Sequence, residues 1–93
     1  MSQIRSFRFH PRVCKDLDSI QPKHHKQITT KMMNLCKEPR PIDSKHLKGQ
    51  PGFYRIDSGE YRTVYTFDDT EVYIRTIGPR NDDEVFERDL RRT

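Results

Sequence analysis

The stretch Leu47–Arg80, LKGQPGFYRIDSGEYRTVYTFDDTEVYIRTIGPR, decides the fold of this chain. It holds most of the aromatic residues, and its apolar and polar residues alternate with a period of two. That period is typical of half-buried β-strands, whose side chains point to opposite faces in turn. Three runs show the pattern: residues 53–57, 61–67 and 71–77.

Short turn-forming segments separate these three runs. Ser58-Gly59 is a tight hairpin signal, and Asp68-Asp69-Thr70 provides a second turn. Gly78-Pro79 is expected to end the third run, because proline cannot donate to a strand ladder. Leu47–Arg80 therefore predicts an antiparallel three-strand meander.

The residues before the meander predict one strand and two helices. Ile4–His10 alternates as a strand, and from Pro11 to Ile20 the apolar spacing changes to that of a short helix. Pro22 interrupts this helix, and a second helix is expected over residues 23–37, with Met32 and Met33 as core residues. The two helices form a predicted α-helical hairpin.

The remaining segments are a basic connector over residues 42–49 and a tail. In the connector, Leu47 is expected to reach the core. In the tail, Asp82 and Asp83 precede apolar residues, which predicts a short C-terminal helix. The whole chain, 1–93, is interpreted as a single α+β domain, with the helices packed on one face of a small sheet.

Composition narrows the class of protein. The hydrophobic content is 31%, so the core is expected to be thin, and the net charge of +4 suits a polyanionic partner such as nucleic acid. No apolar run is long enough to span a bilayer, so no membrane partner is expected. Two cysteines, Cys14 and Cys36, fit a reducing cytoplasm. Metal-binding spacings of Cys and His are lacking, which predicts no metal and no cofactor.

Strand alternation places several charged residues of the meander on one side. Arg55, Asp57 and Arg62 share a face across the hairpin, and Arg80 follows the neighbouring strand. The connector adds three basic candidates: Lys45, His46 and Lys48. Convergent guanidinium groups suit phosphate, because each offers planar and permanently charged donors. The alternative is that these arginines are ordinary exposed residues that keep the sheet soluble.

The string LKG…GFYRI…GEYRTVY…IGPR…EVF resembles the RelE/ParE toxin superfamily, and specifically its RelE-like branch. The resemblance covers residues 47–86. It implies a metal-independent endoribonuclease that cuts mRNA in the ribosomal A site, where the RNA 2′-hydroxyl attacks the adjacent phosphate. It also implies a cognate antitoxin protein as partner, through which the toxin–antitoxin complex binds operator DNA.

The resemblance further implies roles for individual residues. Arg62 matches the arginine that stabilises the transition state, Arg80 matches the phosphate-binding arginine, and Arg55 matches a basic position that is often lysine. Further RNA or phosphate contacts are expected from Lys45 and Lys48, and Phe86 is expected either to stack on an RNA base or to pack on the sheet. Two positions depart from the pattern: Asp57 stands where some members have lysine, and Phe86 stands where several have a tyrosine proposed as general base.

Because phenylalanine cannot accept a proton, the base must be another group, or positioning and charge stabilisation must carry the reaction with a poor or absent base. His46 is the first candidate, since its ordinary pKa lies near neutrality. Three further candidates are Lys45, Asp57 and Glu84. Two other functions stay open: a ParE-like inhibitor of DNA gyrase, and an inactive module that only binds an antitoxin.

Overall fold

The protein was analysed as a computed structural model, which describes residues 4–80. Along the chain, three helical segments come between the first strand and the remaining four. In chain order the elements are β1 (Ser6–Phe9), α1 (Val13–Asp18), the 3₁₀ helix η1 (Pro22–His24), α2 (His25–Asn34), β2 (Lys45–His46), β3 (Tyr54–Ser58), β4 (Tyr61–Phe67) and β5 (Glu71–Pro79).

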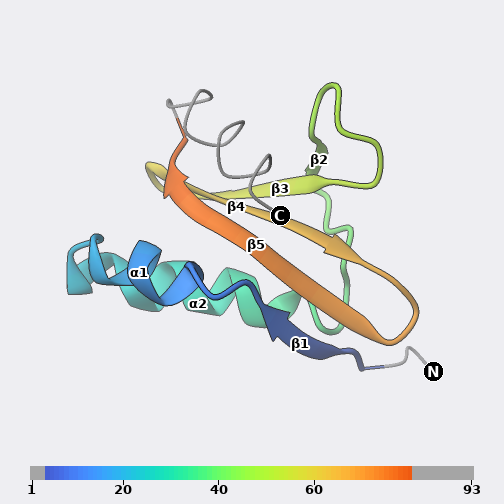
Figure 1. Cartoon of the computed structure of the whole chain (residues 1–93), viewed down its shortest axis with the longest axis horizontal. Coiled ribbons are helices and arrows are strands. Elements are labelled where there is room, and N and C mark those ends of the chain that lie inside the picture. Colours follow the sequence, from blue (N-terminus) through green and yellow to red (C-terminus); the bar gives the residue numbers. More distant parts are fainter. Residues whose placement is uncertain (1–3, 81–93) are drawn as a thin grey trace.

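The five strands form one sheet in the order β1-β5-β4-β3-β2. Strands β3, β4 and β5 are antiparallel neighbours, which confirms the predicted meander. The N-terminal strand β1 runs parallel to β5, and the short strand β2 pairs with β3 at the other edge. The chain is therefore α+β, with α1, η1 and α2 gathered on one side of the sheet (Figure 1).

The main core lies between the helices and this covered face of the sheet. Helix α2 contributes Ile28 and Met32, and the strands contribute residues that alternate toward the helices. The strand residues of this core are Ile56, Tyr65, Val72, Ile74 and Ile77. On the opposite face, which we call the open face, residues 4–80 form a small apolar cluster of Val64 with Leu47 and Phe53. Leu47 was expected to reach the main core, but it packs on the open face against Val64.

A β-bulge shifts the register between β4 and β5. Tyr65 pairs with Ile74 and Val64 pairs with Thr76, so Arg75 is an extra residue on β5. A bulge changes the alternation of the strand that carries it. As a result Ile74 and Ile77, three residues apart, both face the main core.

Helix α1 completes the edge of β5 that β1 leaves unpaired. β1 pairs only with Glu71–Ile74, and beyond it the side chain of Asp16 accepts a bond from the Ile77 backbone N–H at 3.1 Å. Asp16 also accepts from the Thr76 hydroxyl at 3.3 Å. Strand β5, paired with β4 on its other side, continues to Pro79, past the predicted end of the strand.

Three boundaries differ from the prediction for local reasons. The hairpin loop is Gly59-Glu60, since Ser58 is buried and pairs with Tyr61 while Gly59 takes a positive φ of 61°. The second helix ends at Asn34, because the following amides bond three residues back. Residues 45 and 46, which were expected to be part of a connector, form strand β2. The predicted C-terminal helix lies outside the described residues.

Tyr65 gives the core a measurable pH dependence. Its hydroxyl donates to the backbone carbonyl of Pro39 at 2.6 Å, and burial raises the pKa of Tyr65 from 10.0 to about 12. A raised pKa means that the neutral phenol stabilises the fold fully below pH 10 and less as pH rises toward 12.

We expect the urea midpoint of the wild-type protein to fall more steeply between pH 10 and about pH 12 than that of Tyr65→Phe. The variant has no phenol to ionise at this position. Denaturation curves at several pH values in this range measure the difference. Parallel losses in both proteins would contradict the assignment.

Candidate functional site

Arg62 and Asp57 form the centre of the candidate site on the open face. They are directly opposite each other on β4 and β3, and the Arg62 Nε lies 2.9 Å from the Asp57 Oδ1. The other carboxylate oxygen, Oδ2, lies 3.5 Å from an Arg55 guanidinium nitrogen. The Arg62 side chain is only 12% exposed, so Asp57 holds a nearly buried guanidinium in a defined orientation. The sequence prediction that these three residues meet is confirmed.

Arg80 and Lys45 lie at backbone positions close to this centre. The backbone N–H of Arg80 donates to the Glu60 carbonyl at 3.0 Å, beside the register pair of Tyr61 and Pro79 and two positions from that of Arg62 and Gly78. Arg80 is therefore placed at the same end of the sheet as Arg62. Lys45 is exposed and pairs with Arg55, which puts it on the open face.

His46 does not join the arginines. It pairs with Tyr54, its Nε2 lies 3.2 Å from the Tyr54 hydroxyl, and the two rings stand 4.5 Å apart at 76°. Tyr54 packs against the main core, so His46 lies on the helix-covered side of the sheet. The reason is the alternation of β2, because Lys45 takes the open face and its neighbour must take the other one.

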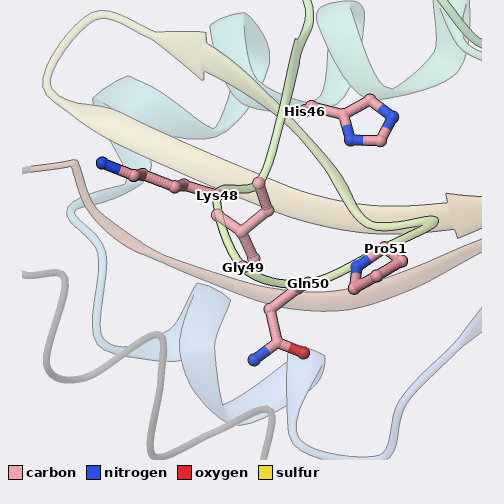
Figure 2. Close-up of a pocket in the computed structure, with 6 residues that line it drawn as sticks. His46, Lys48, Gly49, Gln50 and Pro51 are labelled. Atoms are coloured by element: carbon pink, nitrogen blue, oxygen red, sulfur yellow. The ribbon is translucent and has the colours of Figure 1, made fainter.

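Lys48 lies in the loop between β2 and β3. This loop borders a shallow depression of about 320 Å³ that is lined by residues 46–51 (Figure 2). His46 and Lys48 extend in different directions from the loop (Figure 2). The depression thus does not bring these two basic groups together. Phe86 and Glu84 lie outside the described residues.

Residues 4–80 contain neither a cluster of metal-ligating side chains nor a membrane-spanning helix. Within residues 4–80, no group of three or more His, Cys, Asp or Glu side chains is placed to hold a metal ion. No helix formed by those residues is long and apolar enough to cross a membrane.

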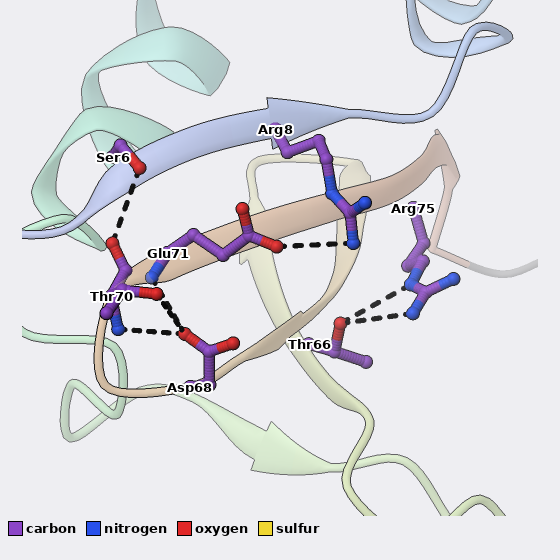
Figure 3. Close-up of polar contacts among 7 residues, drawn as sticks. All are labelled: Ser6, Arg8, Thr66, Asp68, Thr70, Glu71 and Arg75. Carbon is purple, nitrogen blue, oxygen red and sulfur yellow. Dashed lines mark hydrogen bonds and ion pairs between the residues drawn. The ribbon is translucent and has the colours of Figure 1, made fainter.

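Sequence reasoning missed a second basic cluster on the open face, at β1 and β5. The guanidinium groups of Arg8 and Arg75 lie over the Tyr73 ring, at 4.1 Å and 4.0 Å from its centre. Arg8 pairs with Glu71 at 3.2 Å, and Arg75 bonds the Thr66 hydroxyl at 3.4 Å (Figure 3). The alternation of Tyr73 and Arg75 in the third run is visible in the sequence. The pairing of β1 with β5 and the bulge, on which the cluster also depends, leave no pattern in the sequence.

Comparison with known proteins identifies the family. The family described as ParE toxin of type II toxin-antitoxin system, parDE, matches residues 7–84. A Methanocaldococcus jannaschii protein assigned as toxin RelE1 is 36% identical over 76 residues, which are 76% of this chain and 84% of that protein. This chain belongs to the RelE/ParE toxin superfamily. It is a toxin of the kind found in type II toxin–antitoxin systems.

Solved structures of RelE toxins share the fold. A mutant of E. coli RelE in the free state superposes with a TM-score of 0.78 at 24% identity, over 97% of this chain and 98% of that one. The RelE–RelB complex of Pyrococcus horikoshii gives 0.70 at 27% identity, over 84% and 97%. The RelBE2 complex of Mycobacterium tuberculosis gives 0.74 at 26%, over 88% and 98%. This RelE/ParE toxin therefore has the RelE arrangement of helices and sheet.

Proposed function

We propose that this toxin is a ribosome-dependent endoribonuclease that cuts mRNA without a metal ion. The observation that carries the proposal is the Arg62 guanidinium, nearly buried on the open face and held at 2.9 Å by Asp57. A charged group in a fixed position can stabilise negative charge that develops during a reaction without first having to reorganise. Arg55 and Arg80, near the same end of the sheet, would bind the phosphate.

In the proposed reaction the RNA 2′-oxygen attacks the adjacent phosphorus. A new P–O bond forms to the 2′-oxygen and the bond to the 5′-oxygen of the next nucleotide breaks, so the products are a cyclic phosphate and a 5′-hydroxyl end. The phosphate gains negative charge as the new bond forms, and Arg62 would neutralise it. The leaving 5′-oxygen takes a proton from solvent.

Asp57 is the proton acceptor that fits this geometry best. It contacts Arg62 directly, whereas His46 lies on the covered side of the sheet. Lys45 shares the open face, but a charged ammonium group has no lone pair to accept a proton. The Asp57 carboxylate can accept the 2′-hydroxyl proton while it orients Arg62.

Replacing Asp57 with asparagine is expected to lower the cleavage rate by about 100-fold, the usual contribution of a general base. Asp57→Glu, which keeps a carboxylate, should recover part of the rate. Equal rates for Asp57→Asn and Asp57→Glu would reduce Asp57 to a positioning residue.

The proposed partner of this toxin is an antitoxin protein. Structural neighbours in this superfamily are described as complexes, including RelB–RelE of Methanococcus jannaschii and the intact E. coli RelBE. The edge strand β2 is two residues long and exposed, so it could accept a further strand from a partner. We also propose that the complex binds operator DNA through the antitoxin, and that the toxin acts in the cytoplasm.

The test is to add the purified toxin to ribosomes programmed with a defined mRNA and to map the new RNA ends. Cuts in the A-site codon that carry cyclic phosphate ends support the proposal, and uncut mRNA refutes it. The matching family carries the ParE name, so DNA gyrase is the second candidate target. Inhibition of gyrase supercoiling by a protein that leaves the mRNA intact would favour that function.

A further inference from the structure

Arg75 is held by two aromatic rings and a hydroxyl on the open face, apart from the site centred on Arg62. Its guanidinium lies 4.0 Å from the centre of the Tyr73 ring and 5.2 Å from that of Phe53. Its Nε and one terminal nitrogen both reach the Thr66 hydroxyl at 3.4 Å (Figure 3). Two aromatic rings and one hydroxyl thus fix the plane of a half-buried guanidinium.

Arg75 differs from the neighbouring arginines in its lack of a carboxylate partner among residues 4–80. Arg8 is paired with Glu71, and both Arg55 and Arg62 contact Asp57. Among residues 4–80, no carboxylate forms an ion pair with Arg75. A guanidinium can donate five hydrogen bonds, and a single threonine hydroxyl at 3.4 Å satisfies little of this capacity.

The bulge in β5 places Arg75 in line with the candidate active site along strand β4. Arg75 contacts Thr66, which is four residues beyond Arg62 on the same strand and on the same face. At the usual rise of a strand, four residues span about 13 Å. Two phosphate-binding groups at this separation can hold two phosphates of one extended strand.

We propose that Arg75, Phe53 and Tyr73 form a second RNA subsite, in which Arg75 binds a phosphate outside the cleaved bond and Phe53 stacks on a neighbouring base. The identity of the ligand as RNA rests on the proposed function. Guanidinium groups bind phosphate by parallel hydrogen bonds, and aromatic side chains stack on any base. The mixture of cation and aromatic rings favours RNA over an acidic peptide.

Fluorescence anisotropy with a short single-stranded RNA tests the subsite without ribosomes. The RNA carries 2′-O-methyl groups, which prevent the proposed attack. Arg75→Gln is expected to weaken binding about tenfold, as for a lost hydrogen bond to a charged group. The plot of log K against log salt should become shallower by about 0.7, the value for one phosphate contact to a single strand.

Lys26→Gln is the matched control, because it removes one positive charge from an exposed position of α2 on the other side of the molecule. Its affinity and salt slope should stay close to those of the wild type. Arg75→Lys keeps the charge and should keep the slope. Phe53→Leu keeps an apolar contact to Val64 and should weaken binding about fivefold or more with the slope unchanged, since stacking alone is lost.

Equal losses in Arg75→Gln and Lys26→Gln would overturn the subsite, because the effect would then be one of net charge. An Arg75→Gln protein that binds RNA normally and binds the antitoxin more weakly would overturn it in favour of a protein partner. If Arg75→Gln does not fold, the Phe53→Leu result decides. Wild-type protein that binds this RNA through Arg75 yet cuts no mRNA on ribosomes would support the subsite and refute the nuclease.

Discussion

Replacing Arg62 with alanine is expected to reduce A-site mRNA cleavage by about 100- to 1,000-fold, the effect of removing one donor that stabilises transition-state charge. The loss should be this large because the Arg62 guanidinium is nearly buried and oriented by Asp57. Such a group acts in a site with little water, where a charge interaction is stronger than at an exposed position. The rate is measured under single-turnover conditions on programmed ribosomes.

Two further variants show whether the lost rate comes from the planar guanidinium of Arg62, from its positive charge or from damage to the fold. Arg62→Lys keeps a positive charge but lacks the planar fork, so we expect it to recover only part of the lost rate. Arg40→Ala makes the same truncation at an exposed arginine over the Tyr54 ring, on the covered side, and should cleave normally. A folded Arg62→Ala protein that cuts within threefold of the wild-type rate would remove Arg62 from the mechanism.

The second large effect is on stability. Met32→Ala is expected to lower the free energy of unfolding by about 2–5 kcal/mol, as for other large-to-small core substitutions. The Met32 side chain is 4% exposed and packs in the main core against the sheet. A domain of this size has a total stability of roughly 5–15 kcal/mol, so the variant should be close to unfolding at physiological temperature. Urea denaturation at pH 7 measures the change.

The adjacent residue provides the control. Met33 is the same residue type on the same helix, but its side chain is 55% exposed. Met33→Ala should therefore change the stability by less than about 0.5 kcal/mol. Comparable losses at the two positions would mean that helix propensity, and not burial, accounts for the effect. The sequence had suggested both methionines for the core, and only the packing of α2 on the sheet separates them.

Much of the candidate site was predictable, because it depends on one hairpin. Side chains on a strand alternate, and residues paired across a short hairpin must face the same way. The meeting of Arg55, Asp57 and Arg62 follows from these two rules, even though the turn is one residue further along than expected. Which residue accepts the proton did not follow, since the face taken by His46 depends on how the short strand β2 pairs with β3.

The second cluster could not be predicted, because it combines distant parts of the chain. Arg8 comes from the N-terminal strand, Phe53 from the loop before β3, and Tyr73 and Arg75 from the last strand. The parallel pairing of β1 with β5 brings Arg8 to Tyr73. The bulge at Arg75 of β5, opposite Val64 and Tyr65, sets the position of Arg75 relative to β4.

The sequence by itself determined the strands of the meander, the α+β class, the meeting of three charged side chains and the resemblance to a toxin superfamily. These are consequences of local patterns, which a chain carries in its own order of residues. The tertiary structure alone decided that β1 adds to the sheet beside β5, that Asp16 completes the β5 edge, that His46 faces away from the arginines and that Arg75 lies over the Tyr73 and Phe53 rings. Each of these depends on contacts between residues far apart in the chain, and alternation along a single strand does not specify them.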